Sequence, residues 1–326
     1  SFSSQTDSEL IAHLLDYFLN INNSMLDAMF LVIEKLEGAY AIAAIDNNDE
    51  SNIVIARNKS PLLIGLGKDE LLAASDPLAI GQLTNQFIFL EDGDVANISA
   101  NSYQIYDPLK NKIERQISEI DISNEASSKG EYQHFMEKEI FEQPEAVLNT
   151  IDGRVGGNDV FENIFGIGSS DVFMNVKRIQ IVACGTSLHA ARVAANWFSA
   201  ISELPTQTDY ASEYRYRNPH VDEDTLFVTI SQSGETADTL AALKYAKEKG
   251  FLATLTICNV PTSTIARESE FSIFTNAGPE IGVASTKAFT TQLVALMLLA
   301  LSLAKSRSRN PKLRGRVITA LRQLPD

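Results

Sequence analysis

Apolar residues are spaced in two different ways along the chain, and the change falls near residue 177. Before that point, residues 1–20 and 25–36 carry apolar side chains at intervals of three and four, the spacing of amphipathic helices. Thr6 followed by Glu9 forms a capping-box pattern at the first of these segments. Two helices are therefore predicted ahead of any strand.

Short apolar runs follow these helices, and polar turn clusters such as residues 46–48 and 91–94 separate them. Two helices followed by a meander of strands predict an α+β unit with a mostly antiparallel sheet. The predicted strands are residues 40–45, 53–56, 62–66, 71–74, 87–90, 95–98 and 103–106.

A polar, acidic stretch, residues 118–131, is predicted to be a linker. A helical pattern follows over residues 132–149 and is interrupted at Pro144, which cannot continue a helix from its interior. Residues 153–170 have the composition of loops. We accordingly divide the chain into residues 1–122, 123–150 and 151–326.

Beyond Lys177, continuous apolar runs alternate with helical segments, as expected for strands that are buried on both faces. Turns of small residues lead from these runs into helices, and a long apolar helix begins near Ala288. This order predicts a doubly wound, flavodoxin-like parallel sheet and an α/β chain overall. The predicted parallel strands are residues 179–183, 226–230, 252–258 and 271–275.

Charge and cysteine content narrow the possible functions. The net charge is −15, and residues 1–130 contribute −12 of it through 20 acidic and 8 basic side chains. Such an acidic surface repels phosphate backbones, which argues against nucleic-acid binding. The two cysteines and four histidines lack the spacing of disulfide frameworks or metal sites, and we expect a reducing, cytoplasmic compartment.

Two further segments have simple structural interpretations. The longest apolar run comprises 17 residues between Lys287 and Lys305. A membrane span needs about 20 apolar residues, so we predict a buried helix and no membrane contact. Seven basic residues without an acidic one, from Lys305 to Arg322, are interpreted as a solvated helix face.

The candidate chemistry lies where predicted parallel strands end. Residues 184–187, Cys-Gly-Thr-Ser, follow one strand, and residues 231–236, Ser-Gln-Ser-Gly-Glu-Thr, follow the next. Ligands of open parallel sheets bind at these strand ends, and helix N-termini bind phosphate, although the hydroxyls could instead be ordinary helix caps. Neither segment matches a nucleotide-binding glycine pattern, so we predict a site for a small phosphorylated metabolite.

A third loop, residues 276–287, follows the fourth predicted strand and contains two glycines, two hydroxyls, a carboxylate and an amine. Its polar groups are therefore expected at the same sheet edge. Glu280 and Lys287 form either an ordinary ion pair or part of the cavity lining.

These motifs resemble a known family. Residues 184–187, 231–239 and 280–290 are similar to the sugar isomerase (SIS) domain of the glutamine–fructose-6-phosphate aminotransferases, also called glucosamine-6-phosphate synthases. The similarity follows the family's order over nearly the whole chain. Segments 6–13, 38–40, 60–62 and 89–94 resemble its glutaminase domain, and segment 139–144 resembles its interdomain segment.

The resemblance implies a fold and an activity. Residues 1–122 would be part of a glutaminase domain of the N-terminal-nucleophile class, in which two sheets stack between helix layers. Residues 151–326 would be the first of two SIS domains. Family members make glucosamine 6-phosphate from fructose 6-phosphate and glutamine without a metal or organic cofactor, and they generally dimerise through the isomerase half.

The resemblance also implies site residues. Asp7 would bind the amino group of glutamine, although a carboxylate in the first turn of a helix is also stabilised by the helix dipole. Cys184 matches the family motif but is interpreted as a small buried apolar residue. Contacts to the sugar and its phosphate are implied for Thr186, Ser187, Ser231, Gln232, Ser233, Thr236, Val283 and Ser285.

The family's catalytic groups have no counterpart in this sequence. The family nucleophile is an N-terminal cysteine, whereas residue 1 here is Ser1, and motifs of the second SIS domain are not found. We therefore expect a central fragment that keeps part of the sugar-phosphate pocket and has no turnover alone. A structural alternative is that the truncated glutaminase part folds poorly, which would leave residues 1–120 partly disordered or prone to aggregation.

Two other functions are weighed against this one. A sugar-phosphate-binding regulator built on a SIS domain would usually carry a basic helix-turn-helix, which the acidic residues 1–130 do not resemble. An amidotransferase that transfers a phosphoribosyl group would need a pyrophosphate loop in the second domain, and the sequence shows no such motif there.

Overall fold

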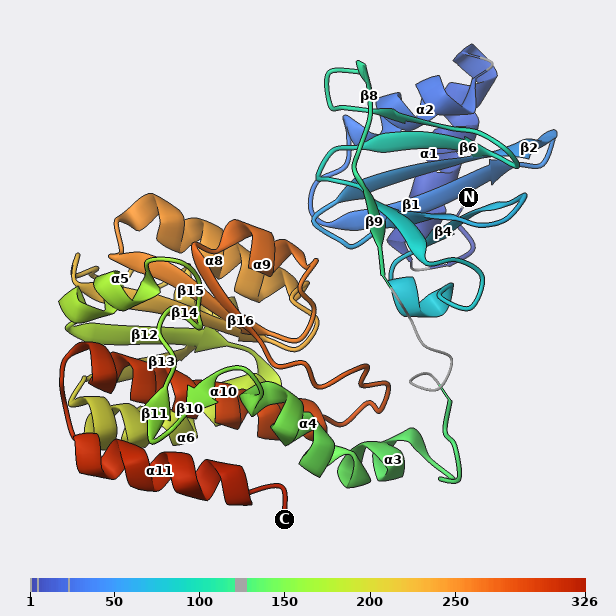
Figure 1. Ribbon diagram of the computed structural model, residues 1–326. Helices are drawn as coiled ribbons and strands as arrows, with labels where there is room; N and C mark the ends of the chain where they lie inside the picture. Colours follow the sequence, from blue (N-terminus) through green and yellow to red (C-terminus); the bar gives the residue numbers. More distant parts are fainter. Residues whose placement is uncertain (1, 5, 23, 121–127) are drawn as a thin grey trace. The chain divides into compact units, whose positions relative to one another are not determined.

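The computed structural model describes residues 2–4, 6–22, 24–120 and 128–326 (Figure 1). The chain separates into two compact units, Ser1–Ser127 and Ser128–Asp326, which are described one at a time. Unit 1 begins with α1 (Asp7–Asn22) and α2 (Met25–Ile33). Ser24 caps α2, because its side chain accepts a hydrogen bond from the Asp27 amide.

Two antiparallel sheets follow in unit 1, with strand orders β1-β2-β6-β7-β8 and β4-β3-β5-β9. Their pairing confirms the antiparallel α+β prediction for this part of the chain. The strands are β1 (Tyr40–Asp46), β2 (Asp49–Asn58), β3 (Leu63–Leu66), β4 (Leu71–Ala74), β5 (Gln86–Phe89), β6 (Val95–Ser99), β7 (Tyr103–Tyr106), β8 (Lys112–Ile113) and β9 (Ile117–Glu119).

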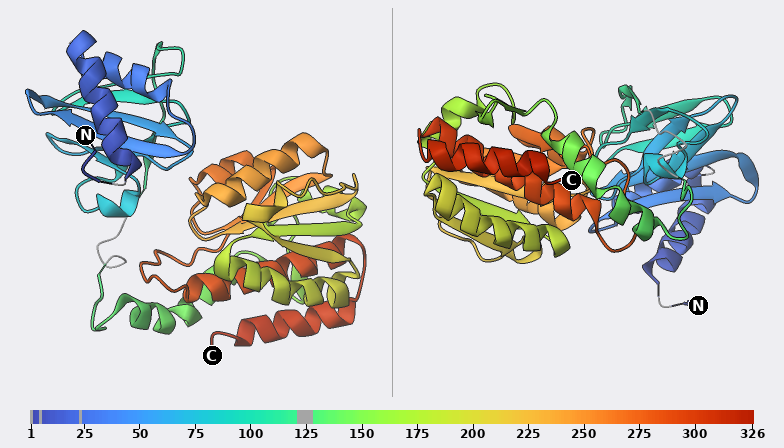
Figure 2. Two further views of the ribbon diagram at one scale, coloured as in Figure 1. Left: turned by 180° about the vertical axis from the view of Figure 1, so that it is seen from behind. Right: turned by 60° about the horizontal axis from the view of Figure 1, so that its bottom comes forward.

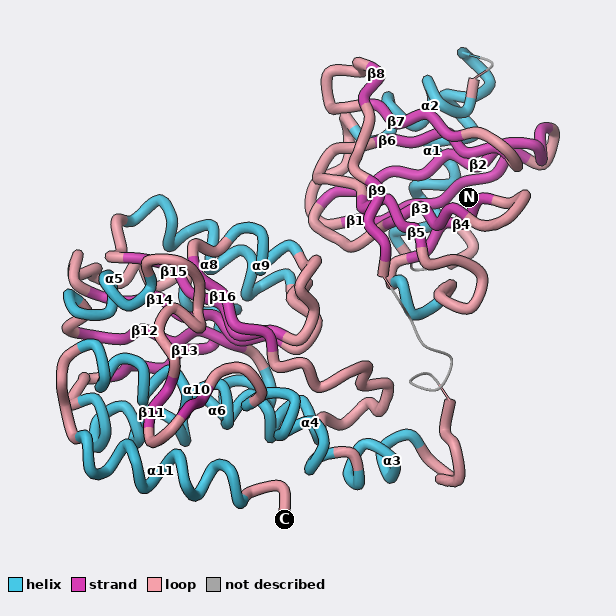
Figure 3. The backbone as a smooth tube through the Cα atoms, in the orientation of Figure 1, coloured by secondary structure: helices cyan, strands magenta, loops and turns pink. Residues whose placement is uncertain are grey.

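Alternation along β2 explains how the layers of unit 1 stack. Val54 and Ala56 belong to the core that β2 shares with α1 and α2. Ile53 and Ile55 belong to a second core with residues of the other sheet, such as Ile64. Successive side chains of a strand point to opposite faces, so one sheet contributes to both cores. The result is a helix layer, a five-stranded sheet and a four-stranded sheet (Figure 3).

Local details of unit 1 differ from the sequence-based expectations. β8 and β9 were not predicted, because two or three residues are too few to show an apolar pattern. The predicted capping box is wrong. Glu9 accepts hydrogen bonds from the amides of Ser3 and Ser4, each at 2.6 Å, and not from the Thr6 amide.

The segment between the sheets of the two units is described only in part. Of the predicted linker, residues 118 and 119 belong to β9 (Ile117–Glu119), and residues 121–127 lie outside the described residues. Unit 2 begins with α3 (Phe135–Phe141) and α4 (Gln143–Ile151). Pro144 lies in the first turn of α4, where a missing N–H is tolerated, so the predicted interruption is confirmed. A short hairpin follows, β10 (Val155–Gly156) and β11 (Asp159–Val160).

A five-stranded parallel sheet forms the centre of unit 2, in the order β13-β12-β14-β15-β16. The chain passes from β12 outward to β13 and then returns to the other side of β12, so the strand order reverses between β12 and β14. This topology confirms the doubly wound, flavodoxin-like prediction. The strands are β12 (Arg178–Ala183), β13 (Thr206–Tyr210), β14 (Thr225–Ser231), β15 (Ala253–Cys258) and β16 (Phe271–Phe274).

Helices cover both faces of this sheet. Val182 and Phe227 pack in one core with residues of α8, whereas their neighbours Ile181 and Val228 pack in the other with residues of α6 and α10. Figures 1 and 2 show α8 and α9 on one side of the sheet and α6 and α10 on the other. The helices are α5 (Ser169–Asn175), α6 (Gly185–Trp197), which ends in a π-helical turn (Phe198–Ser202), α7 (Ala211–Tyr214), α8 (Ala237–Lys249), α9 (Thr264–Glu268), α10 (Lys287–Ser306) and α11 (Pro311–Gln323).

The long apolar helix α10 is a core element of unit 2. By length and hydropathy it could cross a membrane, but 78% of its most apolar window is buried inside the unit. The prediction of a buried helix is confirmed. The interpretation of the basic stretch as a solvated face is wrong at Arg314, which is buried on α11 and donates from Nη2 to Asp159 at 2.8 Å.

Asp94 provides a test of what stabilises unit 1. Its carboxylate is fully buried and accepts hydrogen bonds from Arg115 at 2.8 and 2.9 Å and from the Glu91 amide at 2.8 Å. We predict that Asp94→Ala lowers the free energy of unfolding of unit 1 by about 2–3 kcal/mol, because charge-assisted bonds are lost in a buried place. Hydrogen exchange of the β2 and β6 amides measures this change.

The matched control is Glu114→Ala, which removes an exposed carboxylate next to Arg115. It should change the same free energy by less than about 0.5 kcal/mol. Equal protection of the β2 and β6 amides in the two variants would contradict the role given to Asp94.

Candidate functional site

The hydroxyl-bearing loops of unit 2 lie at one edge of the parallel sheet. Ala183 is in register with Ile230, and Ser231 is in register with Cys258, so β12, β14 and β15 end side by side. Residues 184–187 and 231–236 therefore start at neighbouring strand ends, on either side of the point where the strand order reverses. In α/β sheets such a switch point forms the crevice in which ligands bind.

The first loop is the turn from β12 into α6. Gly185 has a φ of +54°, a conformation that glycine adopts without a Cβ penalty. Thr186 is exposed and Ser187 is buried in the first turn of α6, and no side chain caps this helix. Its first N–H groups are therefore available to an anion, as is typical of phosphate sites.

The second loop is organised by its own hydroxyls. Ser231 Oγ accepts a hydrogen bond from the Gly234 amide at 3.0 Å and lies 2.9 Å from Thr236 Oγ1. Ser233 Oγ accepts one from the Glu235 amide at 3.2 Å. Thr236 precedes α8, but its side chain makes no capping bond. The alternative that these hydroxyls are ordinary helix caps is therefore wrong for α8.

Two polar residues that were not predicted as site residues connect the second loop to its neighbours, α9 and the third loop. Glu235 accepts a hydrogen bond from the Thr264 amide at 2.7 Å, at the start of α9. Asn259 follows β15, and its amide donates to the Gln232 carbonyl at 3.1 Å. The Asn259 side chain donates to the Gly278 carbonyl at 2.8 Å and so joins the second loop to the third. Its position directly after a buried strand was the only signal in the sequence.

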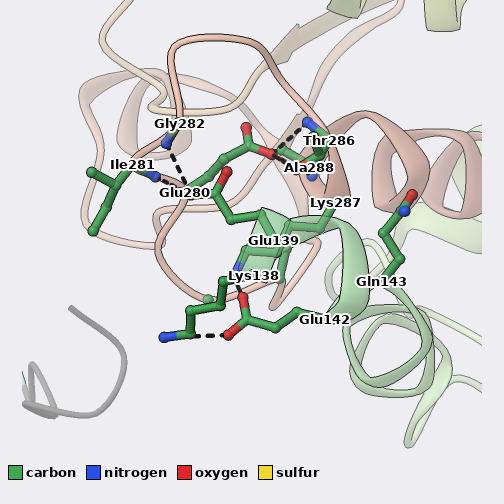
Figure 4. A network of polar contacts seen from close by, with 12 residues as sticks. Lys138, Glu139, Glu142, Gln143, Glu280, Ile281, Gly282, Thr286, Lys287 and Ala288 are labelled. Carbon is green, nitrogen blue, oxygen red and sulfur yellow. Dashed lines mark hydrogen bonds and ion pairs between the residues drawn. The ribbon is translucent and has the colours of Figure 1, made fainter. Parts of the chain in front are cut away.

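The third loop is fixed by a carboxylate at its centre. Glu280 accepts hydrogen bonds from the amides of Thr286 at 2.9 Å and Ala288 at 3.0 Å, so it caps the N-terminus of α10. Lys287 is buried and pairs with Glu142 at 2.7 Å (Figure 4). Of the two alternatives for Glu280 and Lys287, the ion pair between them is therefore wrong, because each of them binds a different partner.

The sugar-contact residues expected on this loop differ in environment. Ser285 donates from its hydroxyl to Glu280 at 3.1 Å and is half-buried. Val283 is fully exposed and lies in the part of the loop between Gly282 and Ser285. An apolar side chain held in solvent is available to pack against a ligand.

Asp7 and the two cysteines are the remaining residues that the sequence singled out. Asp7 is the first residue of α1 in unit 1 and is exposed, a position that also fits stabilisation by the helix dipole. Cys184 is half-buried and not fully buried as expected, and its sulfur lies 4.0 Å from the Thr239 hydroxyl. Burial raises the pKa of Cys258 to about 11, so this thiol is protonated at neutral pH.

Other possible sites are less suited to a ligand. Within residues 2–4, 6–22, 24–120 and 128–326, no group of three or more His, Cys, Asp or Glu side chains could hold a metal ion. A hollow of about 740 Å³ lies near the amino ends of the strands, lined among others by Lys177, Asp224 and Leu252. Lys177 and Asp224 pair at 3.0 Å there, and this edge is opposite to the hydroxyl loops.

Gly234 allows a test of the second loop. Its φ is +68°, and a Cβ atom there would lie 2.1 Å from Ser263 Oγ. Gly250 has a similar φ of +78° but has no atom within 4 Å of the position of a Cβ. We predict that Gly234→Ala lowers the free energy of unfolding of unit 2 by about 2 kcal/mol more than Gly250→Ala, because only the first adds a steric clash to the backbone strain.

Chemical denaturation followed by the fluorescence of Trp197, the single tryptophan of the chain, measures both variants. The packing described around the second loop would be wrong if the two substitutions lowered stability equally.

The comparisons with known proteins agree with this geometry. A family profile described as SIS domain matches residues 173–302. The glutamine–fructose-6-phosphate aminotransferase (isomerizing) of Vibrio vulnificus is 47% identical over 325 residues, which is 99% of this chain and 53% of that protein. The protein of that name from Pseudomonas aeruginosa is 49% identical with the same coverage.

A solved structure, the C-terminal domain of glucosamine-fructose-6-phosphate aminotransferase from Francisella tularensis, is similar with a TM-score of 0.59 and 44% identity. The similarity covers 61% of this chain and 56% of that one. The chain spans about half the length of the curated relatives that it matches. It is a homologue of the glutamine–fructose-6-phosphate aminotransferases over 99% of its residues, and residues 173–302 form a SIS domain.

Proposed function

We propose that this chain is part of an enzyme that makes glucosamine 6-phosphate from fructose 6-phosphate and glutamine. Unit 2 would hold the sugar phosphate at the switch point of its sheet. The observation that carries this proposal is the pair of hydroxyl-rich loops that start at the neighbouring ends of β12 and β14. The names of the curated relatives and the SIS-domain match support the substrate.

The hydroxyls of the second loop are suited to donate to phosphate oxygens. Ser233 Oγ uses a lone pair to accept the Glu235 N–H, so its own proton is free for a ligand. Ser231 and Thr236 share one hydrogen between their hydroxyls, which leaves a second hydrogen to donate. With Thr186, Ser187 and Gln232, these groups would bind the phosphate and the sugar hydroxyls without a basic side chain.

The third loop would complete one wall of the site. Ser285 binds Glu280 through its proton, so its oxygen retains lone pairs that can accept a bond from a sugar hydroxyl. Val283 would cover an apolar face of the sugar, because its side chain has no protein neighbour that shields it from solvent.

Unit 1 would be part of the glutaminase domain. Its two stacked antiparallel sheets, with helices on one side, support this assignment, because the glutaminase fold stacks two sheets between helix layers. Asp7 would bind the amino group of glutamine. The same layers argue against a regulator with a helix-turn-helix domain. The proposed boundaries remain residues 1–122, 123–150 and 151–326.

The setting of the proposed enzyme follows from the same assignment. It would act in the cytoplasm as a homodimer, at the first step of amino-sugar synthesis, with neither nucleic acid nor a membrane as partner. The net charge of −15 supports the exclusion of nucleic acid.

We expect that the polypeptide of 326 residues releases no glutamate from glutamine. Both of its cysteines, Cys184 and Cys258, lie in unit 2, so unit 1 lacks the thiol that the proposed chemistry requires. A coupled assay for glutamate on the purified chain measures this, with a known glutaminase as the positive control. Turnover above the background of a heat-denatured sample would contradict the expectation.

Binding of the product tests the proposed sugar site directly. We expect glucosamine 6-phosphate to bind the chain in a calorimetric titration, and Ser233→Ala to weaken the affinity about tenfold, because one hydrogen bond to a charged phosphate is lost. Thr319→Ala, which removes an exposed hydroxyl on α11, is the matched control and should bind like the wild type. A wild-type chain that does not bind, or a Ser233 variant that binds equally well, would contradict the proposed site.

A further inference from the structure

The third loop is held by a buried carboxylate from a distant part of the chain. Glu139 on α3 is only 2% exposed. Its Oε1 accepts hydrogen bonds from the amides of Ile281 at 2.6 Å and Gly282 at 2.9 Å (Figure 4). A carboxylate that accepts two amide bonds away from water forms a strong, charge-assisted contact. This contact joins positions more than 140 residues apart in the sequence.

The loop approaches Glu139 so closely that a side chain at position 282 would displace the Glu139 carboxylate. A Cβ atom there would lie 2.6 Å from Glu139 Oε2 and 3.5 Å from the Met136 backbone. Within the described residues, Oε2 is buried and has no hydrogen-bond partner. Burial of a carboxylate with one unpaired oxygen costs stability, so a contribution to overall stability does not explain why a glutamate occupies position 139. The hydrogen bonds that Glu139 accepts from the two loop amides explain it.

The segment of α3 and α4 that carries this contact also holds the flanks of the loop. On the C-terminal side, Glu142 pairs with Lys287 at 2.7 Å and Gln143 accepts a hydrogen bond from Thr290 at 2.6 Å. On the N-terminal side, the Thr150 hydroxyl of α4 donates to the carbonyl of Thr275. One helical segment thus fixes the loop before, within and after its exposed part.

The residues expected to line the sugar lie between these fixed points. Val283 and Ser285 follow the two amides that Glu139 binds, and they precede the Thr286 amide that Glu280 binds at 2.9 Å. With both sides fixed, residues 283–285 have little freedom to move independently. We propose that Glu139 is a positioning residue for sugar-phosphate binding, which sets the conformation of the third loop without touching the ligand.

This inference rests on the proposed function of the third loop, and two measurements distinguish a failure of the inference from a failure of that function. The first is amide hydrogen exchange at Ile281 and Gly282 in the chain without ligand, and the second is calorimetric binding of glucosamine 6-phosphate. We expect Glu139→Ala to speed the exchange of both amides and to weaken the sugar affinity, each about tenfold. Glu139→Gln should restore both, because its carbonyl oxygen can accept the same two bonds.

Two further variants control for folding. Glu145→Ala removes an exposed carboxylate from α4 and should behave like the wild type in both measurements. Gly282→Ala keeps Glu139 but adds a Cβ that would displace its carboxylate from the two loop amides. It should therefore reproduce the effects of Glu139→Ala on exchange and affinity, and it supplies an independent test if Glu139→Ala folds poorly.

The outcomes distinguish the inference from the function that it rests on. Wild-type affinity in Glu139→Ala, with or without faster exchange, overturns the positioning role while the sugar site stands. A loss of affinity that Glu139→Gln does not restore, although its two amides are protected, also overturns it. A wild-type chain that does not bind the sugar phosphate counts against the proposed function itself. In that case, exchange of the Ile281 and Gly282 amides that is slow in the wild type and fast in Glu139→Ala would still show that Glu139 holds the loop.

Discussion

The reversal of strand order between β12 and β14 is the constraint on which the rest of unit 2 depends. From β12 the chain turns into α6 on one face of the sheet, and from β14 it turns into α8 on the other. The two helices therefore diverge from neighbouring strand ends, which is the arrangement at which open α/β sheets generally bind ligands. Both turns need a glycine with positive φ, Gly185 and Gly234, because the backbone must change direction within a few residues.

A second constraint concerns the third loop, which has no helix or sheet to satisfy its backbone. Buried N–H groups require partners, and here side chains supply them. Glu280 binds the amides at the start of α10, Glu139 binds those of the loop centre, and Asn259 binds the Ala277 amide at 2.8 Å. The loop is thus ordered by a small number of acceptors, Glu280 from within the loop and Glu139 and Asn259 from other parts of the fold.

The sequence allowed some of these features to be predicted and not others, for physical reasons. β14 was predictable because all seven of its residues are buried and four of the five from Leu226 to Ile230 are apolar, which gives a recognisable strand pattern. β13 was not, because Thr206–Tyr210 forms an edge strand with polar residues and no apolar run. The hydroxyl loops were found from their position after strands, which is a local signal.

The contacts of the third loop with α3 and α4 have no local signal in the sequence. Glu142 and Lys287 are 145 residues apart, so no spacing rule links them, and the nearer Glu280 was a more obvious partner for Lys287. Glu139 likewise occupies one position of a short helix whose pattern does not mark it as buried. The partners of such residues become known only from the structure, because the fold brings together segments that are distant in the sequence.

The distribution of charge shows how an acidic chain can present a site for an anion. The two charged side chains of the third loop are both engaged within the protein, Glu280 with the amides at the start of α10 and Lys287 with Glu142. Glu235 is likewise engaged with the Thr264 amide at the start of α9. What these loops offer to a ligand is therefore a set of hydroxyls and main-chain amides, whose dipoles are fixed by the fold. Because these donors are neutral and held in place before binding, they would select the sugar phosphate of the proposed function by the geometry of its oxygens, where an exposed lysine or arginine would attract any anion.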